Sequence, residues 1–294
     1  MSSRKTSFTA IGTKWSITVH DSVTTDKWQK LLTTIQKRID IFDKTYSRFM
    51  PDSLVSRMSK KAGIYPLPID ANKLLKFYEQ LYLATSGQVT PLIGQALSDA
   101  GYDAKYSFAS KPLTKPPTWE DTIKYDHKKL ELSRPALLDF GAAGKGYLVD
   151  ILSAIIAKAG IHDYVIDASG DILHRSSFNK PISIGLENPM NLKQVIGIAR
   201  LSNASLCASS GARRVWGKYT HILDPTTLLS PQNIIATWVV AKDAMTADGL
   251  STALFFTSPK KLDKFNFSYA ILHNDMQLEY SKSFPAEIFG ATSA

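Results

Sequence analysis

The sequence contains a single cysteine, Cys207, in 294 residues. An internal disulfide is therefore excluded. Cys207 lies in the apolar run Leu206–Ala208, which predicts a buried strand. We interpret its thiol as a small buried hydrophobic group and not as a nucleophile.

Long apolar runs are also missing, so no segment is long enough to cross a bilayer as a helix. The start of the chain, Met1–Phe8, carries charge and lacks the apolar core of a secretion signal. These absences predict a cytoplasmic protein with no membrane span. An exported form with a trimmed signal would look the same. No repeat of 20 to 50 residues is visible, which argues against a solenoid or propeller.

Acidic residues are the minority among the charges. The chain has 35 Lys and Arg against 26 Asp and Glu, a net charge of +9. Such an excess suits nucleic acid, a membrane surface or an anionic small ligand. The basic residues are spread out, and no zinc-finger spacing or RNA-binding signature accompanies them, so we predict no nucleic-acid partner. The densest basic set falls in a Pro-rich stretch at 103–134: Lys111, Lys115, Lys124, Lys128 and Lys129.

The hydrophobic pattern predicts an α+β fold with mixed or antiparallel sheets and packed helices. One amphipathic helix runs from about Trp28 to Tyr46, a second spans 72–85, and others begin near 147 and after Asp243. Strands and helices interleave without regular βα pairs. We predict one domain over 1–294, with 103–134 as a long Pro- and Lys-rich connection that contains short strands. Strands are expected at 8–20, 164–172, 182–186, 195–201, 206–209, 234–241 and 269–273.

The stretch Leu137–Tyr147 predicts a strand, a loop of small residues and a helix. Few side chains stand in such a loop, and free N–H groups at a helix start attract anions. Lys145 would add positive charge, so a phosphate is one expected guest. A tight, well-packed turn is an equal alternative. Neither the P-loop spacing nor the Gly-x-Gly-x-x-Gly spacing of a dinucleotide fold is present.

Two further places carry chemistry. Asp248 and Thr252 are four residues apart and share one face of a predicted helix, where their hard oxygen atoms suit Mg²⁺. Local hydrogen bonds to their own helix are the simpler reading, and the residues alone favour it. His221 could serve as a general base near neutral pH, although a lone histidine is more often structural.

Eight short segments in order resemble the ApbE family of FAD:protein FMN transferases. Each is weak alone, together they cover nearly the whole chain, and the last three are the most specific. They are Gly12-Thr13-x-Trp15, Asp52-Ser53-x-x-Ser56-Arg57, Ser86-Gly87…Pro91-x-x-Gly94, Leu138-Asp139-x-Gly141…Lys145-Gly146-Tyr147, Ala168-x-Gly170-Asp171-Ile172, Ser209-x-Gly211, His221-Ile222-Leu223-Asp224-Pro225 and Asp243-Ala244-Met245-Thr246-Ala247-Asp248…Ser251-Thr252-Ala253.

The resemblance implies an α+β enzyme that binds FAD as substrate together with Mg²⁺. It would transfer FMN to a Ser or Thr hydroxyl of a target protein and release AMP. Two alternatives stay open: hydrolysis of FAD to FMN and AMP, and a flavin-binding protein without catalysis. The joint presence of Asp248, Thr252 and His221 argues against the second alternative.

The resemblance also implies roles for single residues. Asp248, Thr252 and the backbone carbonyl of Ala142 would bind the metal, and His221 would activate the incoming hydroxyl. The implied FAD contacts are Ile11, Gln88, Val89, Thr90, Asp139, Lys145 and Ile222. Departures from the family pattern fall mainly at the flavin-ring contacts, at Ile11 and at Gln88–Thr90, where an aromatic residue and a carboxylate are missing. They imply a divergent member with its metal-binding residues kept.

Overall fold

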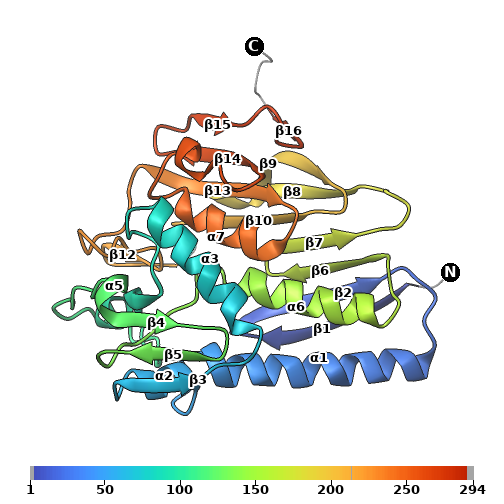
Figure 1. The fold of residues 1–294 in the computed structure, drawn as a ribbon. Helices are drawn as coiled ribbons and strands as arrows, with labels where there is room; N and C mark the ends of the chain where they lie inside the picture. The colour runs from blue at the N-terminus through green and yellow to red at the C-terminus, as the bar shows by residue number, and fades with distance from the viewer. Residues whose placement is uncertain (1–2, 213, 290–294) are drawn as a thin grey trace.

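The computed structural model describes residues 3–212 and 214–289, and these form helices packed against antiparallel sheets, as predicted (Figure 1). The two ends of the predicted 1–294 domain and residue 213 lie outside the described residues. The main helices are α1 (Thr25–Tyr46), α3 (Ala71–Ala84), α6 (Gly144–Lys158) and α7 (Ala244–Ala253), and the shorter ones are α2 (Leu54–Met58), α4 (Gly94–Asp99) and α5 (Trp119–Thr122).

A large antiparallel sheet of eight strands organises the molecule, in the order β1-β2-β6-β7-β10-β13-β14-β15. The sequence jumps from β2 to β6 and from β7 to β10, so segments far apart in the chain become neighbours. The strands are β1 (Arg4–Ala10), β2 (Thr13–Val19), β6 (Tyr164–Ala168), β7 (Asp171–Arg175), β10 (Ser205–Ser210), β13 (Ile234–Ala241), β14 (Phe267–His273) and β15 (Leu278–Tyr280).

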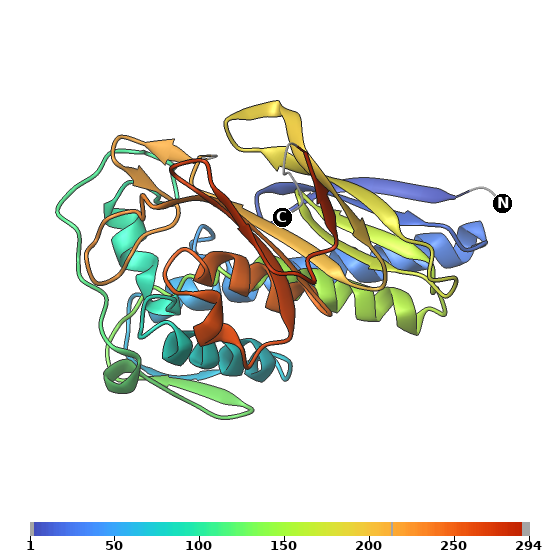
Figure 2. The ribbon, with the colours of Figure 1, turned by 90° about the horizontal axis from the view of Figure 1, so that it is seen from above.

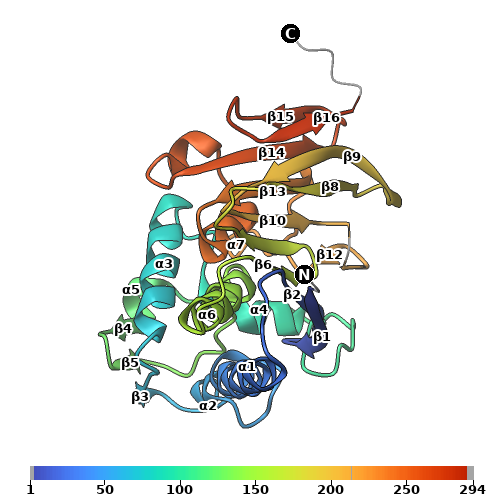
Figure 3. The same cartoon turned by 90° about the vertical axis from the view of Figure 1, so that its right-hand side faces the viewer.

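Different elements pack against the two faces of this sheet. Helices α1, α6 and α7 lie along one face (Figure 3) and share the largest hydrophobic core with it. A smaller sheet of β8 (Ile182–Asn188), β9 (Asn191–Leu201) and β16 (Ala286–Ile288) lies across the other face (Figure 2). There Leu201 and Leu186 belong to a second core with Trp238 of β13. The sheet is therefore buried on both sides over its central strands.

Local sequence signals explain the helices well. The apolar stripe of α1 is buried as expected, and Thr24 caps the helix by accepting a hydrogen bond from the backbone N–H of Lys27. Asp243 caps α7 in the same way, through the N–H of Thr246. Cys207 is buried in β10, as predicted.

Several elements differ from the sequence-based expectation. The run after Pro51 forms α2, because Ser53 accepts from the Ser56 N–H and starts a new helix. Strands β8 and β9 are longer than predicted, since they form a hairpin whose polar tip carries no apolar alternation. None of the helices in the described ranges has the length and apolar character needed to cross a membrane.

The stretch 103–134 contains the short strands expected of it and, in addition, a short helix. It contains α5, β4 (Ile123–Tyr125) and β5 (Lys129–Leu132), and the two strands form a third sheet with β3 (Gly63–Pro66). Trp119 and Leu130 of this stretch are buried in the largest core. The part before α5, residues 100–118, contains no helix or strand.

Helices α6 and α7 approach each other very closely at Gly146. A Cβ atom placed there would lie 2.1 Å from the backbone oxygen of Ala244 and 2.7 Å from the Cβ of Asp248. Only glycine allows this distance, which brings the start of α6 against the face of α7 that carries Asp248 and Thr252. The glycine in the central motif is therefore required by packing.

Replacing Gly146 with alanine is expected to destabilise the protein by about 3 kcal/mol, because the two helices must move apart. Gly144→Ala is the matched control in the same helix turn. A Cβ atom at Gly144 meets its nearest neighbour, the Cβ of Phe140, at an ordinary 3.5 Å. Chemical denaturation of both variants measures the difference, and equal stabilities would contradict the close approach.

Candidate active site

A single cavity of about 490 Å³ brings together all the site residues predicted from the sequence. Its size is typical of a small-molecule binding site. Five separate parts of the chain supply these residues: the β1–β2 turn, the loop after α3, the loop before α6 with the first turn of that helix, the segment after β12 (Tyr219–Thr220), and helix α7. The predicted residues that line it are Ile11, Gln88, Val89, Thr90, Asp139, Ala142, Lys145, His221, Ile222, Asp248 and Thr252.

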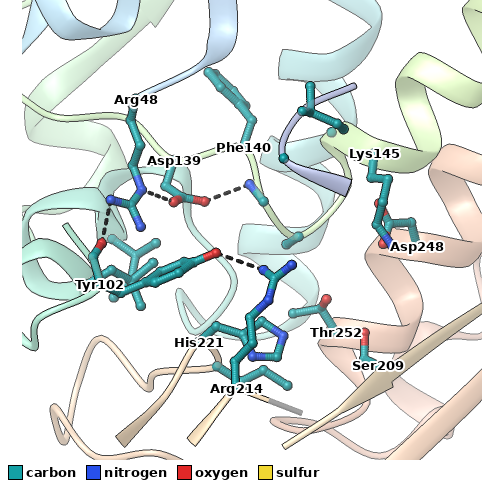
Figure 4. Close-up of a pocket in the computed structure, with 18 of the residues that line it drawn as sticks. Arg48, Tyr102, Asp139, Phe140, Lys145, Ser209, Arg214, His221, Asp248 and Thr252 are labelled. Carbon is teal, nitrogen blue, oxygen red and sulfur yellow. Dashed lines mark hydrogen bonds and ion pairs between the residues drawn. The ribbon is translucent and has the colours of Figure 1, made fainter. Parts of the chain in front are cut away.

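Lys145 forms an ion pair with Asp171 at one end of the cavity (Figure 4 shows Lys145 beside Asp248). Asp171 stands at the start of β7 and is fully buried, while the lysine side chain keeps 24% of its surface exposed. Burial lowers the pKa of Lys145, but the carboxylates of Asp171 and Asp248 outweigh it and raise that pKa above its usual value. The ammonium group is therefore permanently charged.

The simpler reading of the sequence had the Asp248 side chain bonded to its own helix. The structure shows it bonded to another helix, α6. Its Oδ2 accepts a hydrogen bond of 2.8 Å from the backbone N–H of Gly146, in the first turn of α6. From the residues alone, this helix start was either a phosphate site or a well-packed turn. At Gly146 the backbone N–H bonds to the protein's own carboxylate, as in a packed turn, and Lys145 is the basic group that lines the cavity.

The charges in this cluster leave room for a cation. Burial and the neighbouring carboxylate of Asp171 raise the pKa of Asp248 well above its usual range, while Lys145 opposes them. Two carboxylates thus share one ammonium group. Thr252 lines the same cavity one helical turn after Asp248, and its hydroxyl has no hydrogen bond to any other described residue. A carboxylate and a hydroxyl are hard oxygen donors of the kind that Mg²⁺ prefers, and Ala142, the third predicted ligand, lines the same cavity.

His221 lies on the opposite side of the cavity from the Arg48–Asp139 pair, next to Arg214 (Figure 4). Its Nδ1 is buried and has no hydrogen-bond partner among the described residues. Burial, and after it the charges of Arg214 and Lys145, lower the pKa of His221 to about 4. The imidazole is therefore neutral at pH 7, with a lone pair available to accept a proton.

We expect NMR titration of the protein without ligands to give His221 a pKa of about 4, against an ordinary value near 6.5. Because the folded-state pKa is lowered, this group also makes the protein less stable as pH falls from 6.5 towards 4. The resonance is assigned by its loss in His221→Gln. A titration midpoint near 6.5 would show that the imidazole is not buried among positive charges.

The structure adds residues that the sequence analysis did not place in the site. Arg48 is almost fully buried, forms an ion pair with Asp139, and donates to the backbone oxygen of Tyr102 at 2.7 Å. Arg214 donates to the hydroxyl of Tyr102, also at 2.7 Å, and lines the cavity. Arg48 lies two residues after the end of α1, and no motif in the sequence marks it or Arg214 as a site residue.

Residues 11–269 of the chain match the ApbE family. The chain belongs to the ApbE family. Its curated relatives in this family are named FAD:protein FMN transferase. The relative from Haemophilus influenzae is 26% identical over 283 residues, covering 86% of this chain and 81% of its own. The relative from Klebsiella pneumoniae is 23% identical over 272 residues, covering 85% and 77%.

Solved ApbE structures share the fold. The flavin transferase ApbE from Vibrio cholerae superimposes with a TM-score of 0.80 at 20% identity, covering 96% of this chain and 98% of its own. The ApbE protein from Thermotoga maritima gives a TM-score of 0.83 at 20% identity, covering 97% and 100%. This likeness confirms the predicted ApbE-like α+β fold. Ligand roles of single residues remain predictions.

Proposed function

We propose that this ApbE-family chain transfers FMN from FAD to a Ser or Thr hydroxyl of a target protein and releases AMP. The observation that carries the proposal is that His221, from the segment after β12, lines the same cavity as Asp248 and Thr252 of α7. The names of the relatives support the reaction class. The single substrate contacts follow from the resemblance to the family, and each residue assigned to one lines the cavity.

Asp248, Thr252 and the carbonyl of Ala142 would hold a Mg²⁺ ion. When bound, the ion neutralises negative charge on the pyrophosphate and so lowers the barrier to attack on phosphorus. The charge of the cluster supports this fit, because the carboxyl groups of Asp171 and Asp248 both lie near one ammonium group, that of Lys145. Lys145 remains positively charged and contributes a second, fixed cation beside the same oxygen atoms.

The remaining steps fall to groups of the chain itself. The Nδ1 or Nε2 atom of the neutral His221 accepts the proton of the acceptor hydroxyl as its oxygen attacks the phosphorus of the FMN half. A new P–O bond joins FMN to the target protein, and the P–O bond to AMP breaks, so AMP leaves with the bridging oxygen. Phosphate charge near His221 raises the pKa of the imidazole from its low value in the free protein and makes it a stronger base.

Product analysis tests this proposal. The protein is incubated with FAD, Mg²⁺ and the flavin-free target protein of a curated relative, and the mixture is separated on a denaturing gel. We expect a fluorescent flavin bound to the target protein and an equal amount of AMP. Free FMN and AMP in equal amounts, with no labelled target, would instead identify water as the acceptor. No AMP under any condition would contradict both reactions.

A further inference from the structure

A loop of aromatic residues closes one side of the cavity. It follows α4 and carries Tyr106 and Phe108, whose exposed fractions are 45% and 49%. Tyr106 lines the cavity, whereas Phe108 is not among the residues that line it. Asp103 holds the loop in shape, because its carboxylate accepts hydrogen bonds from the N–H groups of Lys105 and Ser107 and from the Ser107 hydroxyl.

The ring of Tyr106 is placed for stacking. It lies parallel to the ring of Phe49, with 5.2 Å between centroids and 6° between planes. Its hydroxyl reaches towards the β1–β2 turn, where a Cβ atom on Gly12 would lie 3.8 Å away. This hydroxyl has no hydrogen bond to any other residue in 3–212 or 214–289. The phenol ring of Tyr106 therefore extends from Phe49 to Gly12, and no hydrogen bond among the described residues holds its hydroxyl.

The backbone of the loop is strained at both aromatic residues. Tyr106 has φ 52° and Phe108 has φ 50°, in the left-handed region that bulky side chains rarely adopt. Such strain persists only where the surroundings impose it, and it gathers at ligand sites. The edge-on contact between Tyr106 and Tyr102, at 5.6 Å, fixes the ring from the protein side. Of the two strained residues, Tyr106 is the one whose side chain lines the cavity.

We propose that Tyr106 is a specificity-determining residue that stacks on the isoalloxazine ring of the flavin substrate. This inference rests on the proposed function, because it takes Ile11 as the neighbour of the flavin. Gly12, which the tyrosine hydroxyl approaches, directly follows Ile11. The groups assigned to phosphate and cation, Lys145 and Asp248, line the same cavity from α6 and α7. A flat ring is held by such a platform with little demand on hydrogen bonding.

The test compares binding of FMN and AMP, which carry one phosphate each, to three variants. Tyr106→Ala is expected to weaken FMN binding by about 10- to 100-fold and to leave AMP binding within about twofold. Tyr106→Phe keeps the ring and should bind FMN nearly as the unchanged protein does. Phe108→Ala is the matched control, since it removes an aromatic side chain at the same backbone conformation outside the cavity.

The fluorescence of bound FMN gives a second readout, because a stacked phenol quenches the flavin. We expect brighter bound FMN in Tyr106→Ala and no change in Phe108→Ala. A loss of AMP binding with FMN binding kept would assign the tyrosine to adenine and overturn the proposal. Equal losses for both ligands, or equal effects of both alanine variants, would reduce the loop to a structural role. Absence of FAD binding to the unchanged protein would instead overturn the proposed function itself.

Discussion

Replacing Asp248 with asparagine is expected to lower the Mg²⁺-dependent rate of FMN transfer by about a thousandfold or more. The amide oxygen can still accept the hydrogen bond from the Gly146 N–H, so the contact between α6 and α7 is kept. The negative charge is lost, and with it the only carboxylate on the α7 face that carries Thr252. The measurement is AMP release at several Mg²⁺ concentrations.

Asp243→Asn is the matched control for this variant. It makes the same chemical change at the start of the same helix, where asparagine caps as well as aspartate, and it lies outside the cavity. Its rate should stay within about twofold of the unchanged protein. A rate for Asp248→Asn that equals the control at every Mg²⁺ concentration would remove Asp248 from the proposed metal site.

Replacing His221 with alanine is expected to slow FMN transfer by about 10²- to 10⁴-fold, while the affinity for FAD changes only a few-fold. The reason is the environment of the imidazole. It is neutral, it lines the cavity, and its Nδ1 has no partner in the described part of the chain, so its available chemistry is proton transfer. Single-turnover rates and equilibrium titrations with FAD separate the two effects.

His127→Ala provides the control, because His127 is exposed and lies outside the cavity. It should leave both the rate and the affinity unchanged. If His221→Ala weakens FAD binding by the same factor as it slows transfer, the residue binds substrate and another group must act as the base. The pH dependence of His221→Ala should also lose the step that belongs to the imidazole.

Local signals were sufficient for the long helices. The stripe of α1 and the caps at Thr24 and Asp243 follow from residue spacing and from hydrogen-bonding side chains, so the sequence predicts them. The resemblance to one family then indicated which polar residues belong together. The cavity contains all of these residues, although the residues taken singly had favoured a structural role for Asp248, Thr252 and His221.

Long-range pairings could not be predicted in the same way. The hydrogen bond between Gly146 and Asp248 joins residues 102 positions apart, and the ion pair of Arg48 with Asp139 joins residues 91 positions apart. No pattern of sequence spacing predicts either contact, because each depends on the order of the strands in the sheet. The pairing of Lys145 with Asp171 is of the same kind and needs β7 beside the start of α6.

The sequence did not predict a site residue in the aromatic loop before α5, and the reason is different. Prolines and lysines make 103–134 look like an exposed connection, and its aromatic residues show no periodic pattern. Their position follows from tertiary contacts with Phe49 and Trp216, which lie on separate elements. Composition therefore identified the segment as irregular and gave no sign that one of its side chains faces the cavity.

Calorimetric titration of FAD into the protein, once with Mg²⁺ and once with EDTA, tests the central claim most directly. The claim is that this one cavity holds FAD together with a divalent cation at Asp248 and Thr252. The account predicts binding at one site per chain that becomes clearly weaker in EDTA. Binding of equal strength under both conditions would contradict the cation site, and no binding under either would contradict the assignment of the cavity to FAD.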